Sequence, residues 1–361
     1  MAGGSWSTYI VSCFASQEST LHQDSDGTLW AGCGTATSGN VGVRRSSDGG
    51  QTWHAPTTNP SGIIDTFRVH DITRGHDGAL YLAGTISQEG TQYRVIRLDT
   101  STPEPYAASA TLIGEPVVPL NSTIGHYAEL PNGAALAVSQ VGQAKLFRPS
   151  PSTGNMASSW TASTDIKQFT SLVTHNGQFY ASGSQIGIPP RIFLPPTAPG
   201  AEPWELVEVV LDTSFDGEMW GIAVNDQRVV AVGINQDDNF GKIYVSNGDP
   251  YDPANFTVHE FRDGELRSWA HGVCMRGNLI AVVGRRLPSG ARVLVSTNGG
   301  TSFTDVSPSG SAILSSCVIA PDGILTVMGS GGFIGVWDGM EITDQIFSDR
   351  FSGNVITFEK N

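Results

Sequence analysis

Residues 46–53 read SSDGGQTW, and residues 296–303 repeat the pattern as STNGGTSF. Each copy follows a short run that contains β-branched residues, at 41–45 and at 291–295. An Asp or Asn side chain can bond the backbone of its own turn, and the paired glycines can adopt positive φ. Each copy therefore predicts a hairpin turn between two strands, closed by an aromatic residue.

The first copy matches S-x-D-x-G-x-T-W at every position and so resembles the Asp-box of sialidase-like β-propellers. The second copy departs from that pattern, with Asn for Asp and Phe for Trp. The residues that carry the resemblance are Ser46, Asp48, Gly50, Thr52, Trp53, Ser296, Asn298, Gly300 and Phe303. In that family the box is a folding element at the blade periphery, away from the active site. The resemblance therefore implies a fold and assigns no activity.

An internal repeat predicts how the propeller is divided. A turn of the Asp-Gly or Asn-Gly kind, followed by an apolar strand that usually ends in glycine, recurs at intervals of 44 to 55 residues. The seven landmark residues are Gly27, Gly78, Gly133, Gly177, Asp226, Gly277 and Gly323. Each interval holds four short strands and their turns. The sequence predicts one all-β domain over residues 1–340, a seven-bladed β-propeller with four-stranded antiparallel blades.

The two ends of the chain are predicted to close the ring. The run at residues 6–11 fits an outer strand of the last blade, next to residues 333–337. Residues 341–361 form a C-terminal tail that we expect to pack on or close that blade. The Pro-rich stretch at residues 187–203 is predicted to be a loop, because proline cannot sit in a central ladder. This loop and the tail are candidate surfaces for an assembly partner.

Composition narrows the partners and the location. The chain has 361 residues and a formal net charge of −14, which argues against a nucleic-acid partner. It contains no apolar run long enough for a membrane span and no signal-peptide pattern at its start. An acidic sequence rich in Ser, Thr, Asn and Gly is typical of extracellular and virion proteins, so we expect an extracellular or virion-associated location.

Neither a metal nor a cofactor is predicted. The four cysteines lack metal-type spacing and are expected to be buried free thiols rather than disulfides; they are Cys13, Cys33, Cys274 and Cys317.

The candidate functional residues precede the landmark turns, because the first strand of each blade lines the central channel. His70, His126 and His271 lie six to eight residues before their turns, and Trp220 and Trp269 have similar places. The histidines are candidate general bases, with Arg68 and Tyr127 beside them as candidate catalytic residues. The candidate ligand-binding residues are Arg68, His126, Trp220 and Trp269, for an anion or a stacked sugar.

Two functions remain open at this point. The first is a non-enzymatic binding or assembly module, at a cell surface or in a virion or tail, that recognises a protein or glycan through one loop-rich face. The alternative is a secreted carbohydrate-active enzyme, a polysaccharide lyase or glycoside hydrolase, using the His/Arg/Tyr pocket. Sialidase chemistry is disfavoured, because Arg191-Ile192 lies mid-chain in the order PPRIF. An enzyme predicts a deep pocket at the channel mouth, in which His70, His126 or His271 lies within hydrogen-bond reach of Arg68 or a carboxylate. A binding module predicts a shallow or plugged mouth and an exposed aromatic or Pro-rich contact surface, for example the stretch at residues 187–203.

Overall fold

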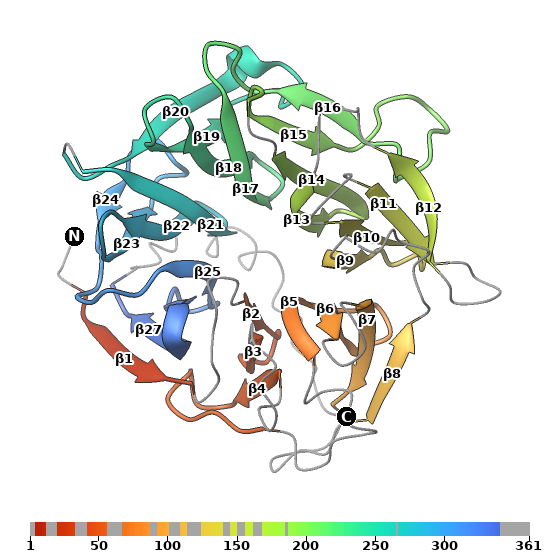
Figure 1. Cartoon of the computed structure of the whole chain (residues 1–361), viewed down its shortest axis with the longest axis horizontal. Helices are drawn as coiled ribbons and strands as arrows, with labels where there is room; N and C mark the ends of the chain where they lie inside the picture. The colour runs from red at the N-terminus through yellow and green to blue at the C-terminus, as the bar shows by residue number, and fades with distance from the viewer. Residues whose placement is uncertain are drawn as a thin grey trace, which may run out of the picture.

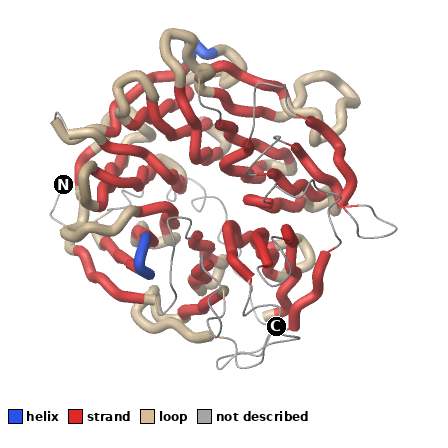
Figure 2. The backbone as a smooth tube through the Cα atoms, in the orientation of Figure 1, coloured by secondary structure: helices blue, strands red, loops and turns tan. Residues whose placement is uncertain are grey.

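The strands of this protein form sheets arranged radially around a central channel (Figures 1 and 2). The computed structural model describes residues 4–11, 20–32, 42–55, 67–86, 92–100, 109–113, 124–139, 145–149, 156–161, 168–184, 187–264 and 266–339. Apart from strands, these residues contain two short 3-10 turns, η3 (Pro253–Asn255) and η4 (Ser330–Gly332). None of the described segments is a helix with the length and apolarity that crossing a bilayer requires.

Each sheet is an antiparallel meander whose innermost strand lines the channel. One sheet has three strands, β2 (Thr20–Gln23), β3 (Leu29–Gly32) and β4 (Val43–Ser46). The next two are β5 (Phe67–Arg74), β6 (Leu80–Ile86), β7 (Gln92–Asp99) and β8 (Ser109–Ile113), then β9 (Ile124–Glu129), β10 (Ala135–Ser139), β11 (Lys145–Pro149) and β12 (Met156–Thr161).

The remaining sheets follow the same order from the channel outward. They are β13 (Gln168–His175), β14 (Gln178–Ser184), β15 (Arg191–Leu194) and β16 (Val207–Val210), then β17 (Gly217–Val224), β18 (Val229–Asn235), β19 (Gly241–Ser246) and β20 (Phe256–Phe261). After these come β21 (Ser268–Arg276), β22 (Leu279–Arg286), β23 (Ala291–Ser296) and β24 (Thr304–Asp305), and finally β25 (Leu314–Ile319), β26 (Leu325–Gly329), β27 (Phe333–Trp337) and β1 (Trp6–Ile10).

The prediction of seven four-stranded blades is wrong. The described residues form six four-stranded blades, and the β2–β4 sheet stops at three strands. Beyond β4, the described residues continue the ladder only as a single bridge between Arg45 and His54. The turn at residues 47–53 occupies the chain between β4 and that bridge, and residues 56–66 lie outside the described residues.

The two ends of the described chain meet in one blade. β1 pairs with β27 in a register that places Trp6 opposite Trp337, which is the pairing predicted between the ends. The backbone N–H of Ser5 also donates to Oδ1 of Asp338 at 2.6 Å. The predicted tail at 341–361 lies outside the described residues.

The Pro-rich stretch at residues 187–203 is only partly a loop, which corrects the prediction. Residues 191–194 form β15, which pairs with β14 on one side and β16 on the other. Ile192, Phe193 and Leu194 are fully buried, so their burial stabilises a strand between flanking prolines. The prolines stay outside the ladder, at positions 189–190 and 195–196.

Both S-x-D/N-x-G turns follow the third strand of their sheet, away from the channel. In the first, Oδ1 of Asp48 accepts hydrogen bonds from Oγ of Ser46 at 2.8 Å and from the backbone of Thr52 at 2.9 Å. The indole N–H of Trp53 closes the turn by donating to the carbonyl of Gly50 at 2.9 Å. Gly50 has φ of 92°, a left-handed conformation that strains other residues.

The second turn repeats this arrangement with an amide in place of the carboxylate. Oδ1 of Asn298 accepts from Oγ of Ser296 at 2.8 Å and from the backbone of Ser302 at 3.1 Å. The ring of Phe303 packs edge-on against His259 at 5.1 Å. The local turn structure predicted for both octapeptides is therefore present.

A β-bulge interrupts the innermost strand of every four-stranded blade. In each case the pairing register skips one residue, and the extra residues are His70, Gly125, Thr170, Trp220, His271 and Ser315. In five of these six blades, the residue just before the bulged residue pairs with a glycine on the second strand. These glycines are Gly84, Gly183, Gly233, Gly284 and Gly329. The bulge thus explains why the landmark strands end in glycine.

The structure gives a steric reason for that glycine. A Cβ added to Gly233 would lie 1.9 Å from the carbonyl oxygen of Glu218, and one added to Gly284 would lie 1.9 Å from that of Trp269. No side chain fits at such a distance, so the bulged backbone approaches the second strand only where a hydrogen replaces Cβ.

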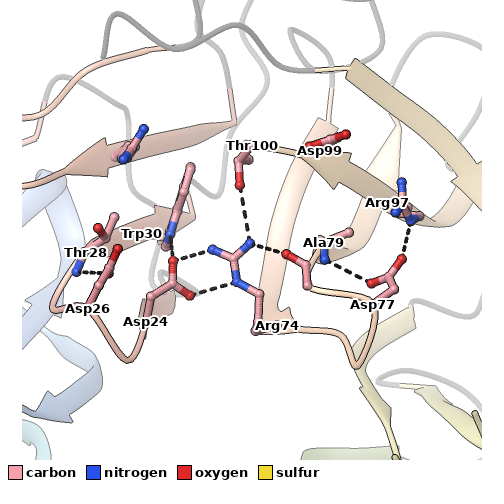
Figure 3. Close-up of a pocket in the computed structure, with 12 residues that line it drawn as sticks. Asp24, Asp26, Thr28, Trp30, Arg74, Asp77, Ala79, Arg97, Asp99 and Thr100 are labelled. Atoms are coloured by element: carbon pink, nitrogen blue, oxygen red, sulfur yellow. Dashed lines mark hydrogen bonds and ion pairs between the residues drawn. The ribbon is translucent and has the colours of Figure 1, made fainter. Parts of the chain in front are cut away.

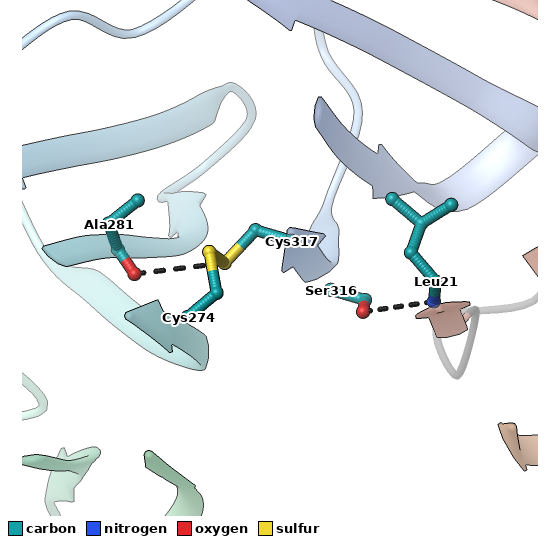
Figure 4. The surroundings of a disulfide bond; sticks show 5 residues. All are labelled: Leu21, Cys274, Ala281, Ser316 and Cys317. Atoms are coloured by element: carbon teal, nitrogen blue, oxygen red, sulfur yellow. Dashed lines mark hydrogen bonds between the residues drawn. A yellow bond between two sulfur atoms is a disulfide. The ribbon is translucent and has the colours of Figure 1, made fainter. Parts of the chain in front are cut away.

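A disulfide joins two neighbouring innermost strands. Cys274 of β21 and Cys317 of β25 are bonded, with their Cα atoms 5.7 Å apart (Figure 4). The expectation of free thiols is therefore wrong for these two, and Cys13 and Cys33 lie outside the described residues. On the other side of β25, the backbone N–H of Leu21 donates to Oγ of Ser316 at 3.0 Å, linking β25 to β2.

Candidate binding site at the channel

The innermost strands enclose a cavity of about 540 Å³ at the centre of the ring. Five of the residues selected from the sequence line it: His70, His126, His271, Trp220 and Trp269. They come from β5, β9, β17 and β21, so strands far apart in the sequence deliver them to one space. The prediction that residues before the landmark turns face the channel holds for these five.

The bulges decide which side chains reach the cavity. His70, Trp220 and His271 are themselves the bulged residues of their strands. In β9 the bulged residue is Gly125, and His126 comes directly after it. Relative to the bulge, His126 is therefore one position later in its strand than His70 and His271 are in theirs. The three histidines therefore do not form an equivalent set.

Two neighbouring strands build an aromatic corner on one wall of the cavity, made of Trp220, Trp269 and His271. The rings of Trp220 and His271 are stacked, with centroids 4.8 Å apart and planes 13° from parallel. Trp269 lies 5.8 Å from Trp220 and is tilted by 58° to it. Nε1 of Trp220 donates to Oε2 of Glu218 at 2.9 Å, which fixes the orientation of that indole.

Arg285 completes this corner, although no sequence pattern had marked it as a candidate site residue. It lies opposite Trp269 in the β21–β22 register, and its guanidinium carbon lies 3.6 Å from the centroid of the Trp269 ring. Arg285 lies on β22, the second strand of its blade. Burial lowers the pKa of Arg285, although a guanidinium remains charged at neutral pH.

His271 is neutral at physiological pH. Burial, with a further contribution from the charge of Arg285, lowers the pKa of His271 to about 3. Within the part of the chain that the structure describes, no hydrogen-bond partner reaches the buried atoms Nε2 of His271, Nε1 of Trp269 or Nε of Arg285. A neutral, buried imidazole is poorly suited to act as a general base at neutral pH.

His126 has a different environment. Its Nδ1 lies 3.3 Å from Oδ2 of Asp71, and Asp71 also accepts from the backbone N–H of Ile72 at 2.9 Å. A histidine oriented by a carboxylate is the arrangement that the enzyme hypothesis predicted. Asp71 directly follows the bulged residue His70. Its position beside His126 could not be inferred from the sequence, because the bulge is visible only in the strand register.

Two sequence-selected residues do not line the cavity. Tyr127 is buried against Tyr81, with ring centroids 5.0 Å apart, and burial raises its pKa above the ordinary value. Arg68 lies on β5, two residues before His70, and is partly exposed. The structure therefore does not bring Tyr127 to the place where a catalytic tyrosine was expected.

A second hollow of about 290 Å³ lies between the β2–β4 sheet and the β5–β8 blade (Figure 3). Two ion pairs lie in it: Nε of Arg74 donates to Asp24 at 2.8 Å, and Nε of Arg97 donates to Asp77 at 2.6 Å. Although burial alone would raise it, hydrogen bonds from His22, Arg74 and Trp30 hold the pKa of Asp24 far below its usual range. This network ties two neighbouring sheets together.

No group of three metal-binding side chains occurs among the described residues.

No protein-family model matches the chain, and no curated protein matches it. Solved structures do. A structure of YCF48 bound to D1 peptide aligns with a TM-score of 0.60 at 17% identity, covering 92% of this chain and 96% of that one. A streptogramin B lyase aligns with a TM-score of 0.64 at 12% identity, covering 93% and 97%. The Cps50 (Swd1) β-propeller domain of Myceliophteria thermophila aligns with a TM-score of 0.58 at 13% identity, covering 92% and 100%. At these identities the likeness establishes the fold, and the chain is a β-propeller.

Proposed function

We propose that this chain is a non-enzymatic binding module that takes a segment of a protein partner into the channel cavity. The observation that carries the proposal is the preformed aromatic corner of Trp220, Trp269 and His271. Aromatic side chains that are rigid and largely desolvated supply much of the affinity in protein interfaces. A cavity of about 540 Å³ has the size of sites that hold a few side chains or a small ligand.

The geometry favours a peptide over a stacked sugar. One face of Trp220 is covered by His271, and one face of Trp269 is covered by Arg285. The two indoles are tilted by 58°, so they do not make a flat platform for a pyranose ring. The solved structure of YCF48 with a peptide gives one propeller with a peptide ligand, and we extend that kind of partner to this chain as part of the proposal.

The proposed location is extracellular, at a cell surface or in a virion or tail. The Cys274–Cys317 disulfide supports it, because disulfides persist in oxidising environments. The net charge of −14 is compatible with such a surface. We also assign the turns after β4 and β23 to the Asp-box type, supported by the shared hydrogen bonds of Ser46 with Asp48 and of Ser296 with Asn298.

A selection from a displayed peptide library tests the proposal. We expect the full chain to enrich a common peptide motif, and Trp220→Ala to lose that binding while retaining its circular dichroism spectrum. Leu266→Ala is the control, because Leu266 is an exposed apolar residue, 47% accessible, away from the cavity. Peptides that bind the Trp220→Ala variant as well as the wild type would refute the proposal. A glycan array run in parallel would refute it if it gave Trp220-dependent glycan binding without peptide enrichment.

A second candidate function rests on the His126–Asp71 pair. We propose as the alternative a carbohydrate-active enzyme, a polysaccharide lyase or glycoside hydrolase, in which Asp71 orients His126 as the base. A panel of polysaccharides incubated with the chain should then give unsaturated or reducing-end products that His126→Ala abolishes. His175→Ala is a matched control, because His175 forms a 2.8 Å pair with Asp226 outside the cavity. Equal product from both variants, or none from the wild type, would dismiss the enzyme.

A further inference from the structure

We propose that the channel cavity recognises a carboxylate group of its peptide partner, and that Arg285 binds that group through its Nη atoms. This inference rests on the proposed function, and it names the chemistry of the ligand at the same site. The carboxylate belongs either to the C-terminus of the partner or to an acidic side chain, and both present the same two oxygens.

Arg285 stands out because nearby arginines are neutralised. Arg286, its neighbour in the sequence, lies 2.5 Å from Asp263, and Arg292 lies 2.9 Å from Asp305. Arg285 has no carboxylate within 4.0 Å among the described residues. Arg285 therefore keeps a positive charge at the cavity wall that no neighbouring carboxylate of the described residues compensates. Such a cation favours an anionic ligand.

The stacking geometry leaves the binding edge of Arg285 available. At 3.6 Å from the Trp269 ring, the planar guanidinium lies flat against the indole, since an edge-on approach would hold its carbon further away. Stacking uses the face of the group and does not consume its N–H donors. Nε is sealed from solvent, whereas the Nη atoms are neither sealed nor bonded within the described residues. The Nη atoms can therefore donate to the two oxygens of a carboxylate, a geometry that lysine cannot reproduce.

The acidic groups around the cavity do not compete for this site. Glu218 lies at the same corner, but Oε2 accepts from Trp220 at 2.9 Å and Oε1 accepts from Gln236 at 2.5 Å. Asp71 pairs with His126 on a different wall. His271 is uncharged, so Arg285 is the fixed cation of the corner, and the aromatic rings beside it suit an apolar side chain next to the carboxylate.

Titration calorimetry with N-acetyl-L-phenylalanine and with its C-terminal amide tests this inference. The acid offers a carboxylate beside an aromatic side chain, and the amide removes only the charge. A charge-assisted hydrogen bond predicts that the acid binds about 10-fold or more tightly than the amide. Arg285→Gln should abolish the difference, whereas Arg286→Gln should preserve it, because Arg286 is already paired with Asp263. Arg285→Lys, which keeps the charge without the planar pair of donors, should retain only part of it.

Each outcome decides the matter. Equal affinity for the acid and the amide, no binding of the acid at millimolar concentration, or undiminished discrimination in a folded Arg285→Gln protein would overturn the carboxylate assignment. Glucuronate serves as a third probe: Arg285-dependent binding of glucuronate without binding of the peptide acid would overturn the peptide source. Library peptides that require Trp220 but are indifferent to Arg285→Gln would leave the proposed function standing and refute only this inference.

Discussion

Replacing Gly284 with alanine should destabilise the protein through the bulge that presents His271. The added Cβ would lie 1.9 Å from the carbonyl oxygen of Trp269 and 3.1 Å from Cα of Ala270. Both atoms belong to the backbone, so they cannot rotate away as a side chain would. The strands must separate by about 1 Å, or the bulge must be lost, to restore ordinary contact.

The magnitude follows from two opposing effects. Overpacking against fixed atoms costs about 3 kcal/mol at the upper end of its usual range. Alanine returns about 0.5–1 kcal/mol, because it restricts the unfolded chain. The expected net loss is about 2 kcal/mol in the free energy of unfolding. The same substitution at Gly233 should cost as much, since its Cβ would also meet a carbonyl oxygen at 1.9 Å, and Gly329→Ala should cost less, with its nearest atom at 2.5 Å.

Urea unfolding is the appropriate assay. In a chain of 361 residues, a loss of 2 kcal/mol lowers the melting temperature by only about 3 °C, because the entropy of unfolding grows with length. The denaturation midpoint at unchanged slope is the more sensitive measure. Gly248→Ala is the control, since the nearest atom to its added Cβ is a side-chain carbon at 3.3 Å. If Gly284→Ala were as stable as Gly248→Ala, the steric account of the bulge would be refuted.

Three further predictions follow from the turns, the histidine and the disulfide. Asp48→Ala should cost about 2 kcal/mol and Asn298→Ala about 1 kcal/mol in urea unfolding, because hydrogen bonds to a carboxylate are stronger than those to an amide; equal losses would contradict that reasoning. The pKa of His271 is lowered from 6.5 to about 3, so as the pH falls this histidine is protonated in the unfolded state before it is protonated in the folded state. The free energy of unfolding that His271 contributes above pH 6.5 is therefore lost as the pH falls, by up to about 1.4 kcal/mol per pH unit. His271→Asn should flatten that dependence between neutral pH and about pH 5, and an unchanged slope would argue against a buried neutral imidazole. Reducing the Cys274–Cys317 bond, which spans 43 residues, should cost about 4 kcal/mol, and Cys274→Ala with Cys317→Ala should match the reduced wild type; identical urea midpoints with and without reductant would mean that the bond contributes nothing.

The landmark turns predicted the propeller and the channel because they are local features. A Gly turn, an apolar strand and a terminal glycine are readable along the chain, and they placed His70, Trp220 and His271 in the cavity. The strand count of the β2–β4 sheet could not be predicted, because the same turn pattern at residues 296–303 leads into β24 of a four-stranded blade. β15 was not predicted, because the prolines on both sides of residues 191–194 indicated a loop and the strand between them is only four residues long.

The site was predicted less completely than the fold, since its decisive contacts cross between strands. Arg285 reaches the cavity because the β21–β22 ladder pairs it with Trp269. The bulge at His271, two residues further along β21, shifts the pairing of all later residues of that strand by one position. The contact between Asp71 of β5 and His126 of β9 likewise crosses between two blades. Cys274 and Cys317 are 43 residues apart, and nothing in that spacing distinguishes a bond from two thiols. Tyr127 was placed wrongly because a residue next to a histidine on a strand points to the opposite side.

The pairing of β1 with β27 also has a mechanical consequence. Trp6 lies opposite Trp337, so the chain enters and leaves this antiparallel pair at the same end. A pulling force applied between Ser5 and Asp338 would load the rungs of the ladder one at a time, starting with the contact between those two residues. In such a pair the backbone hydrogen bonds break one after another, so the pair resists tension weakly. Strands pulled from opposite ends are loaded in shear and must break all their hydrogen bonds together. Anchored by both ends, this propeller would yield first where its ring is joined.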